Sequence, residues 1–331
     1  MKNSGVKKLS GFKKLLKEYS NDPSFPGFIV LVILIIINVS IQPNFFAYST
    51  VKSNFMTFTP LILVSMAQGI IILSGNLDLS VGAGMSLITC IMASMMTDSL
   101  LNVILVVVIG IICAIAMGLF NGSIIGFVRL PPLISTFATS AVFFGLALTI
   151  MPLPGGYVPS YFYRWYRGDV LGFLPVPIFI LLIGIGVWAI IKRTGVYRYI
   201  YAVGGNQDGA YSSGIKVSVI KVMAFVFASL FIALAGISLL LSTSIGDPRA
   251  GQGYMLNSIA AVVIGGISLK GGRGSVAGAI IGALVLGLLI NIIFFLRVSS
   301  LYQNFARGMI IILALSLATI PKLKETSHRI I

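Results

Sequence analysis

The chain has 331 residues, of which 57% are hydrophobic and only 9% are charged, and its mean hydropathy is +1.04. Soluble domains carry about 25% charged residues, so this composition excludes an ordinary water-soluble protein and predicts an all-α integral membrane protein. The net charge of +15 does not indicate nucleic-acid binding, because the basic residues are spread over several loops instead of forming one stripe with aromatic residues.

Apolar runs long enough to cross about 30 Å of hydrocarbon predict the membrane spans. A basic segment at residues 1–24 comes first and a tail at 321–331 comes last. Between them, strong runs lie at 25–41, 53–75, 101–120, 133–151, 174–191, 219–241, 276–296 and 299–320. Two shorter runs, 83–97 and 254–269, fit either short helices or re-entrant segments by length alone. With both included, the chain has about ten transmembrane helices.

The distribution of basic residues supports ten spans with both termini in the cytoplasm. In that arrangement seventeen basic residues face the cytoplasm and five face the outside, with Arg307 inside the last span. This bias agrees with the positive-inside rule. If the run 83–97 alone did not cross the membrane, the polar loop at 192–216 would lie outside the cell and the bias in basic residues would be lost. The two short runs therefore either both cross the membrane or both fail to cross it.

A shared motif divides the transmembrane domain into two halves, residues 25–152 and 174–320. Asp78 is followed by Gly82, and Asp247 is followed by Gly251, each time at the start of a short run. The offset between the two copies is 169 residues. Because five spans separate them, the second copy would be inverted relative to the first, as in many transporter folds. We therefore predict a 5+5 inverted repeat, with coincidence among the 36 glycines as the alternative.

Asp78 is the acidic residue nearest to the hydrocarbon core. A carboxylate at membrane depth is costly unless it is paired or faces water, which makes Asp78 a candidate for a functional role. The alternative is that Asp78 caps the helix that follows it. The candidates for lining the translocation path, at the mouths of the two short runs, are Asp78, Ser80, Asn257 and Ser258.

The sequence predicts neither a catalytic site, nor a metal site, nor a cofactor in this chain. The only histidine, His328, is in the terminal tail, and both cysteines lie inside apolar runs. A glycine-rich stretch at 265–282 lacks the Gly-Lys-Ser/Thr of a nucleotide-binding loop. Its Gly274, Gly278 and Gly282 recur every four residues, which predicts one helix face that allows a neighbouring backbone to approach closely.

Two polar loops remain. In the cytoplasmic loop 192–218, Gly204-Gly-Asn206 predicts a turn with positive φ, and residues 207–213 predict two helical turns that end at Gly214. The extracytoplasmic loop 153–173 is rich in tyrosine and tryptophan, which is typical of an interfacial aromatic belt. Alternatively, its charges belong to a docking face for a binding protein, with Arg164, Arg167, Asp169, Asp247 and Arg249 as the candidates.

Several segments resemble the permease subunits of ribose-type ABC importers, a group that also serves galactose, xylose, arabinose and autoinducer uptake. They are Leu77-Asp-Leu-Ser-Val-Gly82, Ala202-Val-Gly-Gly-Asn206 with Ser213-Gly-Ile215, and the block from Asn257-Ser-Ile-Ala-Ala-Val-Val-Ile-Gly-Gly266 through Ser299-Ser-Leu-Tyr-Gln303. The resemblance covers roughly residues 53–320. It implies a multi-pass permease of a prokaryotic cell membrane that carries a sugar or a sugar-like solute.

The resemblance also implies partners. They are a cytoplasmic ATPase, an extracytoplasmic solute-binding protein and a second permease, either a copy or a paralogue. In such importers a short helix of a cytoplasmic loop sits in a cleft of the ATPase, and the matching loop here is 192–218. The implied coupling residues are Gly205, Asn206, Gly209, Ala210, Ser213, Gly214 and Ile215. The family usually has alanine where this chain has Gly209, and glycine costs a helix about 1 kcal/mol relative to alanine.

The alternative function is a secondary transporter driven by protons or ions. Such a carrier would bury several ionisable residues along its path. Only Asp78, Arg297 and Arg307 lie near membrane depth, and the polar cytoplasmic loop has no evident use in a carrier. The residues therefore favour the importer subunit, while leaving the identity of the solute open.

Overall fold

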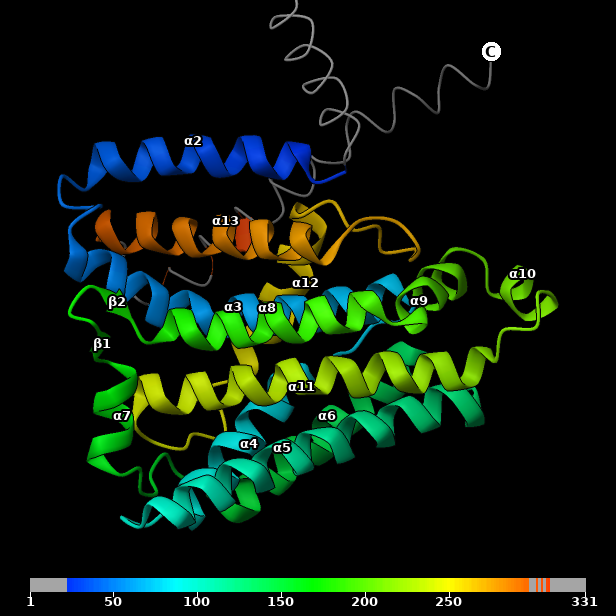
Figure 1. The fold of residues 1–331 in the computed structure, drawn as a ribbon, viewed down its shortest axis with the longest axis horizontal. Helices are drawn as coiled ribbons and strands as arrows, with labels where there is room; N and C mark the ends of the chain where they lie inside the picture. The colour runs from blue at the N-terminus through cyan, green and yellow to red at the C-terminus, as the bar shows by residue number, and fades with distance from the viewer. Residues whose placement is uncertain (1–22, 298–301, 303–304, 306–307, 310–331) are drawn as a thin grey trace, which may run out of the picture.

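The computed structural model describes residues 23–297, 302, 305, 308 and 309. Figure 1 shows long helices lying roughly alongside one another, with α7 at one end of the bundle and α10 at the other; we name these the α7 end and the α10 end. The described part is mostly helical, which confirms the predicted all-α class. Its elements are α2 (Phe25–Ile41), α3 (Tyr48–Leu73), α4 (Val81–Met95), α5 (Leu100–Ser123), η1 (Ile124–Val128), α6 (Pro132–Ile150), α7 (Ser160–Tyr166), β1 (Asp169–Val170), β2 (Leu174–Pro175), α8 (Pro177–Arg193), α9 (Gly195–Gly205), α10 (Gln207–Ser212), α11 (Val217–Thr243), α12 (Gln252–Ile264) and α13 (Val276–Phe295).

In the described part of the chain, five helices are long and apolar enough to cross a membrane: α3, α5 with its extension η1, α6, α11 and α13. Together α8 and α9 would form a sixth span, although the chain bends by 80° between them, and α2, α4 and α12 are shorter apolar helices. Each predicted run from 25–41 to 276–296 coincides with one of these helices. The predicted run 299–320 lies almost entirely outside the described residues, so ten spans and two cytoplasmic termini stay predictions.

The centre of the bundle is formed by α3 and α11. In their most apolar stretches 89% and 78% of the residues are buried, compared with 28% in both α5 and α6. The outer faces of α5 and α6 expose large apolar side chains such as Ile112 and Phe137. Exposed apolar helix surface is stable in lipid, where all backbone polar groups are satisfied within the helix. These two helices therefore contribute a lipid-facing side of the molecule.

A non-helical segment, residues 74–80, and the short helix α4 that follows it run from the α10 end of the bundle to the α7 end. The carbonyl oxygen of Leu73, where α3 ends, accepts a hydrogen bond of 3.1 Å from the backbone N–H of Gly272 at the α10 end. Near the other end of α4, the carbonyl oxygen of Ala93 accepts a 2.8 Å hydrogen bond from Tyr157, three residues before α7. Irregular backbone at this depth is tolerated because protein surrounds it.

The starts of α4 and α12 contact each other directly. A methyl group on Gly82 would lie against the carbonyl oxygen of Gly251, and a methyl group on Gly251 would overlap the carbonyl oxygen of Gly82. The backbone N–H of Gly251 also donates a 2.9 Å hydrogen bond to the hydroxyl of Ser86. The two glycines of the repeated motif are therefore required for close backbone contact between the two halves of the chain.

The glycine-rich stretch at 265–282 requires one correction. Gly274 does not lie on a helix face, because it has a φ of 112° and α13 begins only at Val276, with Ser275 as its N-cap. Gly278 and Gly282 do lie on α13. A methyl group on Gly282 would overlap the carbonyl oxygen of Ala261 in α12, so glycine there allows the two helices to pack backbone against backbone.

Candidate functional site

The short helix predicted in the loop 192–218 is α10. The side chain of Asn206 caps it, since its Oδ1 accepts a 2.9 Å hydrogen bond from the backbone N–H of Gly209. Gly214, with a φ of 81°, follows the helix, and the N–H of Ile215 donates back to the carbonyl oxygen of Ala210 at 3.1 Å. Apart from buried Ala210, most of this segment is exposed. A compact, capped helix is thus presented at one end of the bundle (Figure 1).

Gly209 lies next to the Asn206 side chain that caps α10. A methyl group at this position would lie 2.9 Å from Nδ2 of Asn206, the side chain that accepts the capping hydrogen bond. Alanine would gain about 1 kcal/mol of helix propensity but would press on the cap. Glycine at position 209 therefore leaves the Asn206 side chain free of this contact.

Four glycines, Gly75, Gly204, Gly271 and Gly272, meet where α9 reaches the end of α3; we name them the glycine junction. A methyl group on Gly204 would overlap the carbonyl oxygen of Leu73 and would lie 2.9 Å from the backbone nitrogens of both Gly75 and Gly272. The predicted turn with positive φ at 204–206 is wrong, because Gly204 and its neighbour form the last turn of α9. Glycine is needed here for backbone contact between three segments.

Asp78 lies three residues after Gly75 of the glycine junction. The carboxylate of Asp78 is buried, and its Oδ1 accepts hydrogen bonds of 2.7 Å from the N–H and 2.6 Å from the hydroxyl of Ser80. Asn121 of α5 donates a 2.8 Å hydrogen bond to the same hydroxyl. In addition, Thr136 of α6 accepts a 3.0 Å hydrogen bond from the N–H of Leu79. Asp78 therefore organises the turn before α4, while Ser80 and Leu79 of that turn bond to α5 and α6.

Asn121 and Thr136 escaped the sequence analysis because neither belongs to a motif or a charged cluster. The other two path candidates, Asn257 and Ser258, are both buried on α12, and the hydroxyl of Ser258 donates to the carbonyl oxygen of Met255 at 2.8 Å. The structure thus places Asp78 with Ser80, while Asn257 and Ser258 lie on the helix whose start contacts α4.

Further buried polar atoms lie on α3 and α5. Among the described residues, both amide atoms of Gln68, the hydroxyl of Ser65 and Oδ1 of Asn121 have no protein hydrogen-bond partner. Buried polar atoms in proteins are nearly always paired with protein or with water. Gln68 is a polar residue inside an apolar span, and this pattern could have identified it from the sequence. Its unpaired amide makes Gln68 a further candidate for contact with water or solute.

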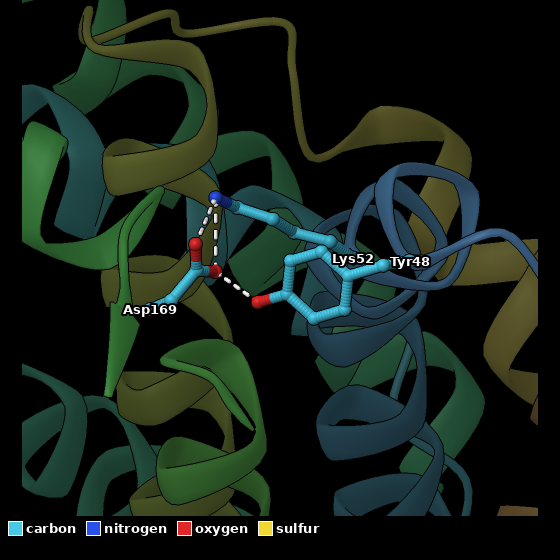
Figure 2. Close-up of polar contacts among 3 residues, drawn as sticks. All are labelled: Tyr48, Lys52 and Asp169. Carbon is cyan, nitrogen blue, oxygen red and sulfur yellow. Dashed lines mark hydrogen bonds and ion pairs between the residues drawn. The ribbon is translucent and has the colours of Figure 1, made fainter. Parts of the chain in front are cut away.

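The loop at the α7 end is held to the helices by two of the docking candidates. Figure 2 shows Asp169 accepting a hydrogen bond from the hydroxyl of Tyr48 and forming an ion pair of 3.0 Å with Lys52, both of α3. The hydrogen bonds from Tyr48 and Lys52 hold the pKa of Asp169 below its usual value. Asp169 also pairs with Pro175 in the antiparallel β1–β2 hairpin. This carboxylate is therefore engaged within the chain.

Arg167 is engaged as well. Its Nη2 donates to the carbonyl oxygen of Ser242 at 2.7 Å and to the hydroxyl of Ser244 at 2.6 Å, at the end of α11. Its guanidinium carbon lies 5.2 Å from the centre of the Tyr163 ring. Arginine at this position joins the loop to α11, because the guanidinium group offers several donors to the last carbonyl oxygens of a helix.

The remaining docking candidates differ in exposure. The side chains of Arg164 and Arg249 are exposed. Oδ1 of Asp247 accepts a 2.7 Å hydrogen bond from the N–H of Arg249, which is the same local turn that Asp78 makes with Ser80. Among the five docking candidates, Arg164 and Arg249 are thus the two with exposed side chains that the contacts described here leave open to a partner.

Comparison with known proteins assigns the family. Over residues 51–315 the chain matches the family described as the permease component of the branched-chain amino acid transport system. The chain belongs to this permease family. It is 36% identical to the ribose import permease of Haemophilus influenzae, covering 87% of this chain and 90% of the relative. The ribose import permease of Bacillus subtilis is 37% identical, with 88% and 91% covered. The D-allose transport system permease of Escherichia coli is 31% identical, with 88% and 90% covered. No solved structure matches the chain.

Membership of this family makes the protein an ABC importer permease, an integral membrane transport subunit rather than an enzyme. The helices of the bundle agree with it, since several are apolar and long enough to cross a membrane. The family gives no support to the alternative of a secondary carrier.

Proposed function

We propose that the permease forms the membrane path of a sugar importer in a prokaryotic cytoplasmic membrane, with energy from a separate ATPase and solute from an extracytoplasmic binding protein. The relatives named for ribose, D-allose and L-arabinose support a sugar as the solute, although the family description names amino acids. The observation that carries the proposal is α10, a capped and exposed helix connected to the interior through the glycine junction. The chain needs no cofactor of its own for this role.

In the proposed mechanism the ATPase moves α10, and the glycine junction transmits the movement. Only Asn206 separates α10 from α9, so a displacement of α10 acts directly on the last turn of α9. That turn is in backbone contact with Leu73 and Gly75, and Asp78 follows three residues later. Backbone atoms in direct contact cannot be compressed much, because closely packed protein interiors have low compressibility. The turn before α4 would therefore shift together with α10.

We also propose ten spans arranged as a 5+5 inverted repeat, with both termini and α10 in the cytoplasm. Two observations support the repeat: Asp78 and Asp247 make the same local turn, and Gly82 and Gly251 contact each other at the starts of α4 and α12. The path for solute would pass near these starts. Its polar groups would come from Asp78, Ser80, Asn257 and Ser258, together with Gln68 and Asn121. A second permease, a copy or a paralogue, would complete the path.

The decisive experiment measures sugar uptake in cells that carry the permease with or without its partner ATPase. Uptake of labelled pentoses or hexoses should require the ATPase and should be inhibited by unlabelled substrate. Uptake that persists without the ATPase but collapses with the proton gradient would refute the proposed importer. Competition by branched-chain amino acids, with no effect of sugars, would instead refute the sugar assignment alone.

A further inference from the structure

A basic groove lies at the α10 end, between the turn that joins η1 to α6 and the start of α11. It has a volume of about 700 Å³, and α10 forms part of its wall through Asp208 and Tyr211. The cations that line it are Arg129, Lys216 and Lys221, against the single acidic residue Asp208. Within residues 23–297 the one ion pair is formed elsewhere, by Lys52 and Asp169. The groove therefore carries unneutralised positive charge.

The groove is rigidly built. Arg129 ends η1 in the left-handed conformation, with a φ of 62°, and Pro131 caps α6, whose first residue is Pro132. Close contact holds η1 to α11, because a methyl group on Gly126 would lie 2.6 Å from the carbonyl oxygen of Ser218. Lys221 is half-buried and lines the same groove as Arg129. An arrangement that forces cations together gains stability when an anion binds between them.

The surface beside the groove is apolar. Phe127 and Val128 are 60% and 64% exposed, and the exposed apolar surface continues along α6 through Leu133 and Ile134. Since α5 and α6 are long apolar helices with mostly exposed surfaces, this face meets acyl chains. The basic groove thus lies where a lipid-facing surface gives way to a charged end of the bundle. Basic pockets in such positions, between transmembrane helices, bind anionic lipid head groups.

We propose that this groove binds the phosphate head group of an anionic phospholipid, whose acyl chains lie along the exposed apolar surface of η1 and α6. An acidic protein segment fits the charge equally well but leaves the adjoining apolar surface uncovered, so the lipid accounts for both features. Because α10 forms one wall, the bound lipid also holds the coupling helix against the turn between η1 and α6. The composition of the membrane would thereby affect how α10 responds to the ATPase. The site itself does not depend on which solute is transported.

The test is native mass spectrometry of the purified full-length chain in neutral detergent, titrated with phosphatidylglycerol or phosphatidylcholine. Each basic residue near a membrane surface strengthens binding of an anionic lipid by about fivefold, so loss of three should weaken phosphatidylglycerol binding by roughly 100-fold. The variant is Arg129→Asn with Lys216→Gln and Lys221→Gln; asparagine tolerates the left-handed backbone at position 129. Lys216→Gln with Lys221→Gln, which leaves the turn unchanged, should weaken binding by about 25-fold.

The matched control removes the same charge from the same end of the bundle, with Arg198→Gln, Lys270→Gln and Arg273→Gln. It should retain phosphatidylglycerol as the unaltered protein does. Equal loss of binding in both triple variants, or equal retention of phosphatidylglycerol and phosphatidylcholine by the unaltered protein, would overturn the proposal. Displacement of the lipid by millimolar inorganic phosphate would overturn it too, because the site would then take free phosphate. Unchanged lipid binding with loss of the co-purifying ATPase would identify a protein contact instead.

Discussion

Replacement of Gly204 by alanine tests the glycine junction, and Gly205 supplies a matched control on the same helical turn. A methyl group on Gly204 overlaps the carbonyl oxygen of Leu73 and lies 2.9 Å from the backbone nitrogens of Gly75 and Gly272. A methyl group on Gly205 meets only the Cα of Gly272, at 3.9 Å. Both positions have helical backbone, so both variants gain the same helix propensity, about 1 kcal/mol.

The expected effects differ because backbone atoms of two other segments must move in one variant only. Overpacking of a closely packed interior costs about 1–3 kcal/mol, and the obstacles at Gly204 are backbone rather than flexible side chains. We therefore expect Gly204→Ala to be less stable than Gly205→Ala by about 3 kcal/mol, the upper end of that range. The helix-propensity gain cancels in this comparison.

The assay compares the two variants in proteoliposomes with the partner ATPase and the binding protein, recording solute uptake and ATP hydrolysis together. Gly204→Ala should transport less solute per ATP hydrolysed, because the turn before Asp78 no longer follows α10. Gly205→Ala should match the unaltered protein in both quantities. Thermal unfolding in detergent measures the difference in stability. If both variants unfold at the same temperature and transport with the same yield per ATP, the glycine junction does not transmit the movement.

The other predictions concern α10 and the loop at the α7 end. Gly214→Val should uncouple hydrolysis from uptake, since valine at a φ of 81° is strained by about 1–3 kcal/mol, whereas Gly214→Asn should preserve coupling. Equal coupling in both variants would contradict this. Arg164→Glu should reduce delivery by the binding protein at normal membrane levels, while Arg167→Glu should also lower the thermal stability; unchanged uptake with Arg164→Glu would remove it from the docking face. The lowered pKa of Asp169 means that its contacts are present at neutral pH and are lost only as the pH falls through that lowered value. Protease cleavage of the loop 153–173 should therefore stay slow from pH 7 to about 5, and Asp169→Asn should be cleaved faster throughout; equal rates would refute the anchoring role.

The local sequence predicted much of α10. Asn206, the exposed residues after it and Gly214 define a capped helix and its end through contacts within a few residues. Hydropathy likewise located the apolar helices, because each run has to satisfy its own backbone in lipid. Gly274 was misplaced by the same kind of reasoning, since the cap at Ser275 starts α13 after the first glycine of the repeat.

The candidate path was less predictable. Asp78 stands out in any reading of the chain because it is a carboxylate among apolar residues. Its neighbours Asn121 and Thr136 do not, because each is an ordinary polar residue inside a different helix. Arg167 was one candidate for a docking face but donates to the end of α11, and no local pattern distinguishes those two orientations of an arginine.

The amino-acid sequence by itself determined that this is a membrane protein, where its apolar helices lie and that its polar loop contains a short helix ended by Gly214. These properties depend on composition and on interactions between residues close together in the chain. Only the tertiary structure decided what Gly204 does. It lies in the last helical turn of α9 and not in a turn with positive φ, and it is glycine because α9 crosses the end of α3 and the loop before α13 with their backbones in contact. Such contacts depend on how distant segments pack, and no local pattern records them.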